Sequence, residues 1–499
     1  MPALLANLAI LVFALSPLPG LIAGGSWLWL APVLALVVFP LLDHLLPRVR
    51  AAATLGRPSP LLFLYLPFHA FLILFGAARV ASLPAASPEL WLTAFSVGIV
   101  TGGIGITFAH EWVHHLKPRE RLLGEWLLVW VAYGHYATEH VYGHHKNVGL
   151  REDGATARKN EWIQTYIPRA LYQVWRSAFR LKPARTLAHG LATLAIAAGI
   201  ALAFGRSGLL FFFAQAAVAV LLLTSIDYIE HYGLERKRSA DGRAEAVKPH
   251  HSWDSDTRLM GEVLIRLQRH ADHHMRPLKP YPELALLAGA PRLPTGYAGM
   301  IWLAWWPHAW FRVMNPRLAR TPLVPFGPNT WSTSVGLEGS AERAKGGVRL
   351  RFGLRVADPA LLYALVPEAG PSSERRDELW RTTCFEAFFG VAGSPAYFEF
   401  NAAPSGAWAW YAFDDYRKGM AKPVLDSNAE PRLLSFTRRE ESLEAVWFIP
   451  DAAFGGRTID AVSPTAVLDR AGEIGYWAAK HAGVEPDFHR RDSFVVRLG

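Results

Sequence analysis

Fourteen of the 19 histidines lie between His110 and His274, and most of them fall into four short motifs. The motifs read H-E-W-V-H from His110, E-H-V-Y-G-H-H from Glu139, E-H-Y-G-L from Glu230 and H-A-D-H-H from His270. Residues four apart share a face of a helix, so two imidazoles of one motif can reach one metal ion. Neutral imidazole suits iron, zinc, copper or nickel. Because a catalytic zinc takes only three protein ligands, this many nitrogen donors predicts two metal ions.

Other interpretations explain fewer of these residues. A single histidine is usually a hydrogen-bonded core or surface residue. An intramembrane zinc protease could use the H-E-W-V-H motif alone, but it would leave most of the clustered histidines without a role. A non-enzymatic metal or ligand sensor is a further alternative. Metal analysis separates these classes, because one zinc ion would exclude a two-metal centre.

Four carboxylates lie among the histidines: Glu111, Glu139, Glu230 and Asp272. A metal-bound histidine usually donates its second ring N–H to a carboxylate or a carbonyl. We therefore expect these four residues to support the ligands. The alternative is ordinary charge on a helix surface.

The elements that must position these motifs are apolar helices. A membrane-spanning helix needs about 20 mostly apolar residues. Six segments qualify, in three closely spaced pairs: 5–24, 26–46, 60–82, 90–109, 187–206 and 208–228. The first of them lacks a basic start and a cleavage site, which predicts a membrane helix and not a removed signal peptide.

The net charge of +9 is explained by basic residues at the ends of the apolar segments. This pattern is typical of the cytoplasmic side of a membrane protein, and it argues against nucleic-acid binding. It places 47–59, 110–186 and 229–499 in the cytoplasm, with both termini. We expect residues 110–186 to form a helical cap on the bundle, in the inner (cell) membrane of a bacterium.

A second domain follows. Residues 321–328 are rich in proline and glycine and predict a linker between a membrane domain, 1–320, and a domain at 329–499. Short alternating runs predict strands. These are Val348–Val356, Thr383–Phe389, Ala396–Asn401, Trp408–Phe413, Ser442–Phe448 and Ile474–Ala479. The predicted fold is an all-α six-helix transmembrane bundle with a cytoplasmic helical cap, plus a C-terminal β-sandwich.

Residues 1–320 resemble the integral-membrane alkane 1-monooxygenases of the membrane fatty acid desaturase and hydroxylase superfamily. The resemblance rests on the four motifs together, above all on E-H-Y-G-L at 230–234, which separates this branch from the acyl desaturases. It implies nine histidine ligands for two non-haem iron ions: His110, His114, His140, His144, His145, His231, His270, His273 and His274. It leaves His135, His250 and His251 outside the ligand set.

The resemblance also implies a reaction. Dioxygen reacts at reduced iron, and the terminal methyl of an alkane or alkyl chain becomes a primary alcohol. An alkane has no carbonyl to polarise, so a cofactor must perform the difficult step. Val113, His115 and Leu150-Arg151 depart from the family pattern, which leaves the substrate open: a long alkane, a medium one or an alkyl aromatic of the xylene type. A membrane lipid desaturase of the same superfamily is a separate alternative, and the E-H-Y-G-L stretch argues against it.

Electrons must come from another protein, because Cys384 is the only cysteine and cannot build an iron–sulfur centre. The resemblance implies a rubredoxin or a ferredoxin that is reduced by an NAD(P)H reductase. A basic cytoplasmic face suits an acidic donor.

Residues 329–499 resemble a DOMON-like β-sandwich. The resemblance rests on L-W-R-T-T-C-F-E-A-F from Leu379, on Y-F-E-F-N from Tyr397 and on P-D-F-H from Pro486. Such domains bind haem or sugars, and His489 is the candidate haem ligand. The alternatives are a tryptophan-filled core without a ligand and a docking site for the electron donor.

Overall fold

The computed structural model describes residues 3–49, 58–239, 241–327, 329–367 and 374–498. Two units divide the chain: Met1–Leu286 with Ala290–Asn315, and Leu287–Gly289 with Pro316–Gly499. Residues 50–57 of the expected link 47–59 and Pro328 of the expected linker lie outside the described residues.

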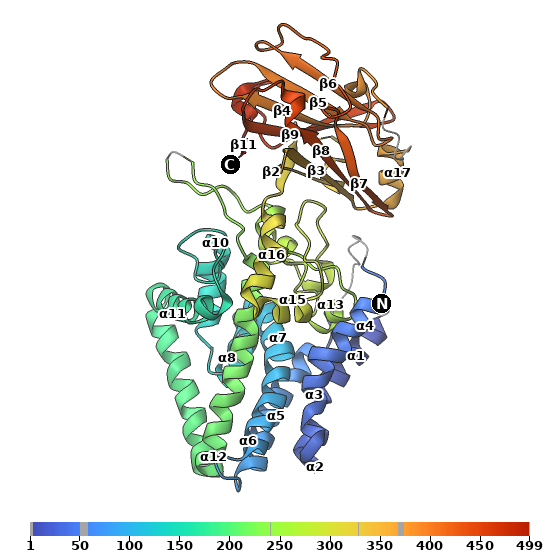
Figure 1. Cartoon of the computed structure of the whole chain (residues 1–499). Coiled ribbons are helices and arrows are strands. Elements are labelled where there is room, and N and C mark those ends of the chain that lie inside the picture. The colour runs from blue at the N-terminus through green and yellow to red at the C-terminus, as the bar shows by residue number, and fades with distance from the viewer. Residues whose placement is uncertain (1–2, 50–57, 240, 328, 368–373, 499) are drawn as a thin grey trace. The chain divides into compact units, whose positions relative to one another are not determined.

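The first unit is helical (Figure 1). Its longer helices are α1 (Ala3–Leu15), α5 (Leu61–Val80), α6 (Pro88–Val100), α8 (Pro118–Trp130), α11 (Ile163–Leu181), α12 (Pro183–His231) and α16 (Pro307–Leu318). Its shorter α-helices are α2 (Leu18–Ala23), α3 (Leu30–Val33), α4 (Phe39–Leu45), α7 (Thr107–Val113), α9 (Tyr136–Glu139), α10 (His145–Asn147), α13 (Leu259–Val263), α14 (His270–Met275) and α15 (Tyr297–Ala304). The helices α6, α8 and α12 each begin with proline, whose missing N–H costs nothing in the first turn.

Five helices among the described residues are long and apolar enough to cross a membrane: Leu4–Ala23, Gly25–Leu45, Leu61–Val80, Pro88–Val113 and Pro183–His231. The chain is an integral membrane protein. The fifth helix covers both segments of the third expected pair, 187–206 and 208–228. It is broken at Gly205, which has φ 67° and ψ −164°, a conformation that favours glycine.

Three π-helical segments interrupt the helices of the described residues: η2 (Leu34–Val38) and two segments that adjoin the histidine motifs. η3 (Thr101–Ile106) joins α6 to α7, and η4 (His140–His144) joins α9 to α10. Both lie directly beside histidine motifs. A π-turn closes its hydrogen bonds between residues five apart and occurs frequently at functional sites.

The second unit is a β-domain. Its strands are β1 (Thr321–Pro325), β2 (Val335–Ala344), β3 (Gly347–Val356), β4 (Cys384–Val391), β5 (Tyr397–Ala402), β6 (Trp408–Phe413), β7 (Arg432–Arg439), β8 (Ser442–Pro450), β9 (Ile459–Arg470), β10 (Glu473–Ala478) and β11 (Val496–Arg497). The neighbouring strands are β6-β5-β4-β9-β10-β1-β2-β3-β8-β7, and β11 pairs with β9. Each of the six expected runs overlaps one of these strands.

Strand β1 connects the two halves of this strand order. Thr321–Leu323 pair with β2, and Val324 and Pro325 pair with β10. The two halves pack face to face, since Phe352 of β3 stacks on Phe385 of β4 at 5.4 Å between ring centroids. The expected C-terminal β-rich domain is therefore present. The expectation of a linker at 321–328 was wrong for 321–325, because this segment is a strand. Its first three residues pair with β2 and its last two pair with β10.

Candidate metal centre

The nine histidines of the motifs are carried by the ends of helices. His110 lies in α7 and His114 directly follows it. His140 and His144 lie in the π-helix η4, and His145 begins α10. His231 is the last residue of α12, and α14 carries His270, His273 and His274. Segments from four distant parts of the chain thus meet at one place.

The histidines form two groups. Within each group, the ligand atoms all lie within 4.8 Å of one another. The five-histidine group is His110, His114, His140, His145 and His273. The four-histidine group is His144, His231, His270 and His274. Together the groups contain all nine histidines expected from the sequence.

In the five-histidine group the Nε2 atoms point at one another. Nε2 of His140 lies 3.0 Å from that of His114 and 3.1 Å from that of His145. Nε2 of His145 lies 3.0 Å from that of His273. His110 faces the same space, with its ring 4.5 Å from that of His140, and its Nε2 has no hydrogen-bond partner among the described residues.

The four-histidine group repeats this arrangement. Nε2 of His274 lies 2.9 Å from that of His270 and 3.2 Å from that of His144. Nε2 of His270 lies 3.0 Å from that of His231. All four side chains are buried.

This geometry fits a bound metal ion better than it fits hydrogen bonds between rings. A neutral imidazole carries one ring proton, so a chain of converging Nε2 atoms cannot satisfy every nitrogen. Two nitrogens bound at right angles to one metal at about 2.1 Å lie about 3.0 Å apart. The observed separations of 2.9–3.2 Å match that spacing.

The division between the groups departs from the expectation for the second motif. His140 and His144 were expected to share a face and to reach one metal, as residues of an α-helix do. The structure places His140 with His145, and His144 in the other group. The reason is the π-turn η4, in which residues five apart share a face.

Two carboxylates contact histidines of the four-histidine group. Asp153 accepts a hydrogen bond at Oδ2 from Nδ1 of His144 at 2.9 Å, which leaves Nε2 free for a metal. Oε2 of Glu230 lies 3.3 Å from Nε2 of His270, while Oε1 accepts a hydrogen bond from Tyr297. Glu230 therefore faces the metal-binding side of the ring. Asp153 was not among the expected residues, and only its position nine residues after His144 could have suggested it.

The other three expected carboxylates have different surroundings. Asp272 is buried and pairs with Arg276 and Lys279 at 2.6 and 2.8 Å. Glu111 accepts a hydrogen bond from the backbone of Tyr281 at 3.3 Å and lies 3.8 Å from His115. Glu139 is buried beside Gly143, and its Oε2 has no hydrogen-bond partner among the described residues.

His115 and the three histidines left out of the ligand set lie outside both groups. His115 contacts Glu120 at 2.8 Å, and hydrogen bonds with Glu111 and Glu120 raise its pKa. His251 accepts a hydrogen bond at Nδ1 from the backbone of Lys248 at 3.0 Å.

Apolar membrane helices with two histidine groups at their ends define a membrane protein with a candidate metal centre. The fatty acid desaturase family matches residues 86–304, the part of the chain that carries all four motifs. That segment includes every histidine of both groups.

Curated relatives identify the branch. Alkane 1-monooxygenase 1 of Pseudomonas aeruginosa is 39% identical over 237 residues, which are 45% of this chain and 62% of the relative. Alkane 1-monooxygenase of Ectopseudomonas oleovorans is 36% identical over 273 residues, 52% of this chain and 68% of the relative. The chain belongs to the alkane 1-monooxygenase family. It spans less than two thirds of the Pseudomonas aeruginosa relative.

A solved structure from Bacteroides uniformis, described as a candidate carbohydrate-binding protein, matches 36% of this chain with 16% identity and a TM-score of 0.27. That score is below the level of a shared fold. The DOMON-like assignment of the β-domain stays a prediction.

Proposed function

We propose that this protein is a histidine-ligated diiron monooxygenase. It inserts one oxygen atom of O2 into a terminal C–H bond of an alkane or alkyl chain and gives a primary alcohol. The observation that carries this proposal is the pair of histidine groups, His110, His114, His140, His145 and His273 beside His144, His231, His270 and His274. Support comes from relatives that are named for alkane 1-monooxygenation.

The nine histidines are the proposed iron ligands. Imidazole nitrogen suits iron, and two groups of donors provide for two ions. The two irons, when bound, supply the activation of O2 that an unreactive C–H bond requires. Asp153 holds the ring of His144 in the orientation that presents Nε2, and Tyr297 fixes the carboxylate of Glu230 beside His270.

The proposed substrate end of the site is apolar. A narrow cavity beside His110 and His270 is lined by Ile106, Leu223 and Ile226. The cavity measures about 10 Å³, and Asp227 and Glu230 also line it, so it is a narrow crevice beside the histidines and not a preformed channel for a whole hydrocarbon chain. Gly102 lies on the same wall, where a Cβ atom would meet the backbone of Ala219 in α12 at 2.8 Å.

The proposed membrane arrangement has six spans, with the break at Gly205 separating the last two. Residues 110–186 form the cytoplasmic cap, and both termini lie in the cytoplasm. The membrane domain is 1–320, and the β-domain is 321–499, which includes strand β1. The basic residues that follow the fourth and sixth spans support this orientation in an inner membrane and a docking face for an acidic rubredoxin or ferredoxin: Lys117, Arg119, Arg121, Arg236, Lys237 and Arg238.

Product analysis tests the proposal. The full chain is expressed with a rubredoxin and its NAD(P)H reductase and supplied with n-alkanes of graded length and with xylene. We expect primary alcohols by gas chromatography and about two irons per purified chain. An unsaturated product indicates the desaturase alternative, and a benzylic alcohol indicates the alkyl-aromatic one. A single zinc ion, or no oxygenated product from a protein with two irons, contradicts the proposal.

A further inference from the structure

One sheet of the β-domain is buried on both faces. Every residue of β4 is buried, although an antiparallel sheet commonly leaves one face to solvent. Phe385 and Phe389 belong to the core between the two sheets, and Cys384 and Phe388 belong to a second apolar cluster on the opposite face. That second face is therefore a separate covered site.

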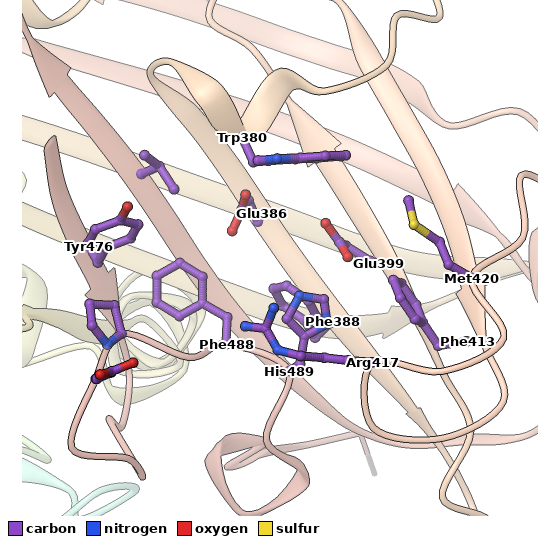
Figure 2. Close-up of a pocket in the computed structure, with 13 residues that line it drawn as sticks. Trp380, Glu386, Phe388, Glu399, Phe413, Arg417, Met420, Tyr476, Phe488 and His489 are labelled. Atoms are coloured by element: carbon purple, nitrogen blue, oxygen red, sulfur yellow. The ribbon is translucent and has the colours of Figure 1, made fainter. Parts of the chain in front are cut away.

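A pocket of about 680 Å³ lies on this second face. Five aromatic side chains, from strands and from the loops that cover them, line its walls: Trp380, Phe388, Phe413, Tyr476 and Phe488. A volume of this size suits a small organic ligand. Figure 2 shows these side chains around a common space.

Two glutamates point into the pocket from adjacent strands. Glu386 of β4 is 2% exposed and Glu399 of β5 is 5% exposed. The register pairs Glu386 with Asn401 and Phe388 with Glu399, so the two carboxylates are diagonal neighbours on one face. In Figure 2 they lie between the ring of Trp380 and the rings of Phe388 and Phe413.

Each carboxylate has one oxygen engaged by a neutral group. Oε2 of Glu386 accepts a hydrogen bond from Thr465 at 3.3 Å, and Oε1 of Glu399 accepts one from Asn401 at 2.9 Å. Among the described residues no ion pair includes Glu386 or Glu399. One oxygen of each therefore remains available to a ligand.

The positive groups of the pocket are engaged elsewhere. Arg417 lines the pocket but pairs with Asp487 at 3.0 Å. His489 contacts the hydroxyl of Tyr397 at 2.7 Å, and burial lowers its pKa to about 4, so it is neutral at physiological pH. Glu485 adds a third carboxylate to the lining. The pocket thus holds more carboxyl groups than unpaired basic groups, in a chain whose net charge is +9.

Burial disfavours the ionised form of the two buried carboxyl groups, Glu386 and Glu399. It raises the pKa of Glu386 well above its usual range, and it raises the pKa of Glu399 to about 7 even though Arg417 opposes the change. Buried charges are stable when a partner of opposite sign neutralises them. A cationic ligand would supply that partner, and aromatic faces attract the same cation.

We propose that this pocket binds a small organic amine, with its ammonium N–H groups donating to Glu386 and Glu399 and its hydrocarbon part lying against Trp380, Phe388 and Phe413. A primary or secondary ammonium fits better than a quaternary one, because the free carboxylate oxygens are hydrogen-bond acceptors. A neutral polyol could also contact carboxylates and aromatic rings, but it would leave the charge uncompensated.

Calorimetric titration of the detergent-purified full chain tests the proposal. The probe is 2-phenylethylamine at about pH 8, where its ammonium form and the Glu399 carboxylate both predominate. Three matched compounds accompany it: 2-phenylethanol lacks the charge, the N,N,N-trimethyl derivative lacks the N–H donors, and glucose represents polyols. We expect the amine to bind at least about tenfold more tightly than each of them.

Two variants locate the binding site. Glu386→Gln and Glu399→Gln keep the shape of the side chain and remove its charge, so each is expected to weaken amine binding at least about tenfold. Glu485→Gln, at an exposed position of the same lining, is the matched control and should change affinity by less than about threefold. Thermal melting of the ligand-free variants verifies that they are folded.

Several results would overturn the proposal. These are no amine binding by the folded protein, equal binding of the amine and the alcohol, glucose as the preferred ligand, and unchanged affinity in both glutamine variants. The test does not depend on hydroxylase activity, so failure of either proposal leaves the other standing.

Discussion

The two histidine groups differ in how they are supported. The five-histidine group has an additional imidazole, and its expected carboxylate Glu111 contacts Tyr281 and His115. The four-histidine group has fewer donors, but Asp153 holds one of its rings and Glu230 lies 3.3 Å from another. One group thus offers more neutral donors and the other offers nearby negative charge. For the two irons that we propose, the comparison predicts different affinities and different responses to substitution.

The largest expected effect on activity follows from removing one histidine of the five-histidine group. We expect His273→Ala to abolish hydroxylation while the protein remains folded in the membrane, because the ion held by the four remaining histidines lacks one of the donors that set its geometry and reactivity. Product formation by whole cells measures the activity, and circular dichroism measures folding. His308→Ala is the control, since His308 is exposed and contacts only Trp162 among the ring contacts of the described residues. Full activity of the His273 variant would show that the ligand assignment is wrong.

The next effect distinguishes the two groups directly. His231→Ala leaves three donors in its group, whereas His145→Ala leaves four. We therefore expect His231→Ala protein to retain about one iron per chain and His145→Ala protein to retain closer to two. Metal analysis after dialysis against a chelator measures the difference. Equal iron content in the two variants would remove the basis of the comparison.

A smaller effect is expected at Asp153. Asp153→Asn keeps a hydrogen-bond acceptor for His144 but removes the negative charge, and we expect a loss of about 10- to 100-fold in iron affinity or activity. Glu152→Gln is the matched control, because Glu152 pairs with Arg238 at the surface. If the two variants behave alike, Asp153 does not support the four-histidine group.

The smallest effect is expected at Glu111, although it lies within the first motif. Its contacts with Tyr281 and His115 are outside both groups, so Glu111→Gln should change turnover by less than about threefold. Steady-state rates of alcohol formation provide the measurement. A loss as large as that of Asp153→Asn would instead indicate a carboxylate role in the five-histidine group.

The sequence predicted which histidines meet but not how they divide. Motif spacing and the family resemblance selected all nine residues of the two groups. The assumption of an α-helix then put His140 and His144 together, and nothing in the letters E-H-V-Y-G-H-H shows that the backbone widens into a π-turn. Asp153 was missed because its contact with His144 depends on how the chain folds back after His145.

The β-domain shows a similar limit. Strand β6 was predicted at its observed bounds, Trp408–Phe413, because aromatic and apolar residues fill it. Strand β7 was missed because it is mostly exposed and basic, and β9 because Pro464 lies in its middle. The pocket could not be predicted, because Glu386 and Glu399 become neighbours only through the pairing of β4 with β5.

The π-turn at His140–His144 acts as a one-residue phase shift in an otherwise α-helical segment. Each residue of an α-helix turns the chain by about 100°, so an additional residue in one turn redirects every side chain after it. Removing Tyr142 would restore the ordinary phase and rotate His144 and His145 together. The two adjacent histidines can serve different ions only while that phase shift is kept, so the length of this short turn is as strict a requirement as the identity of its histidines.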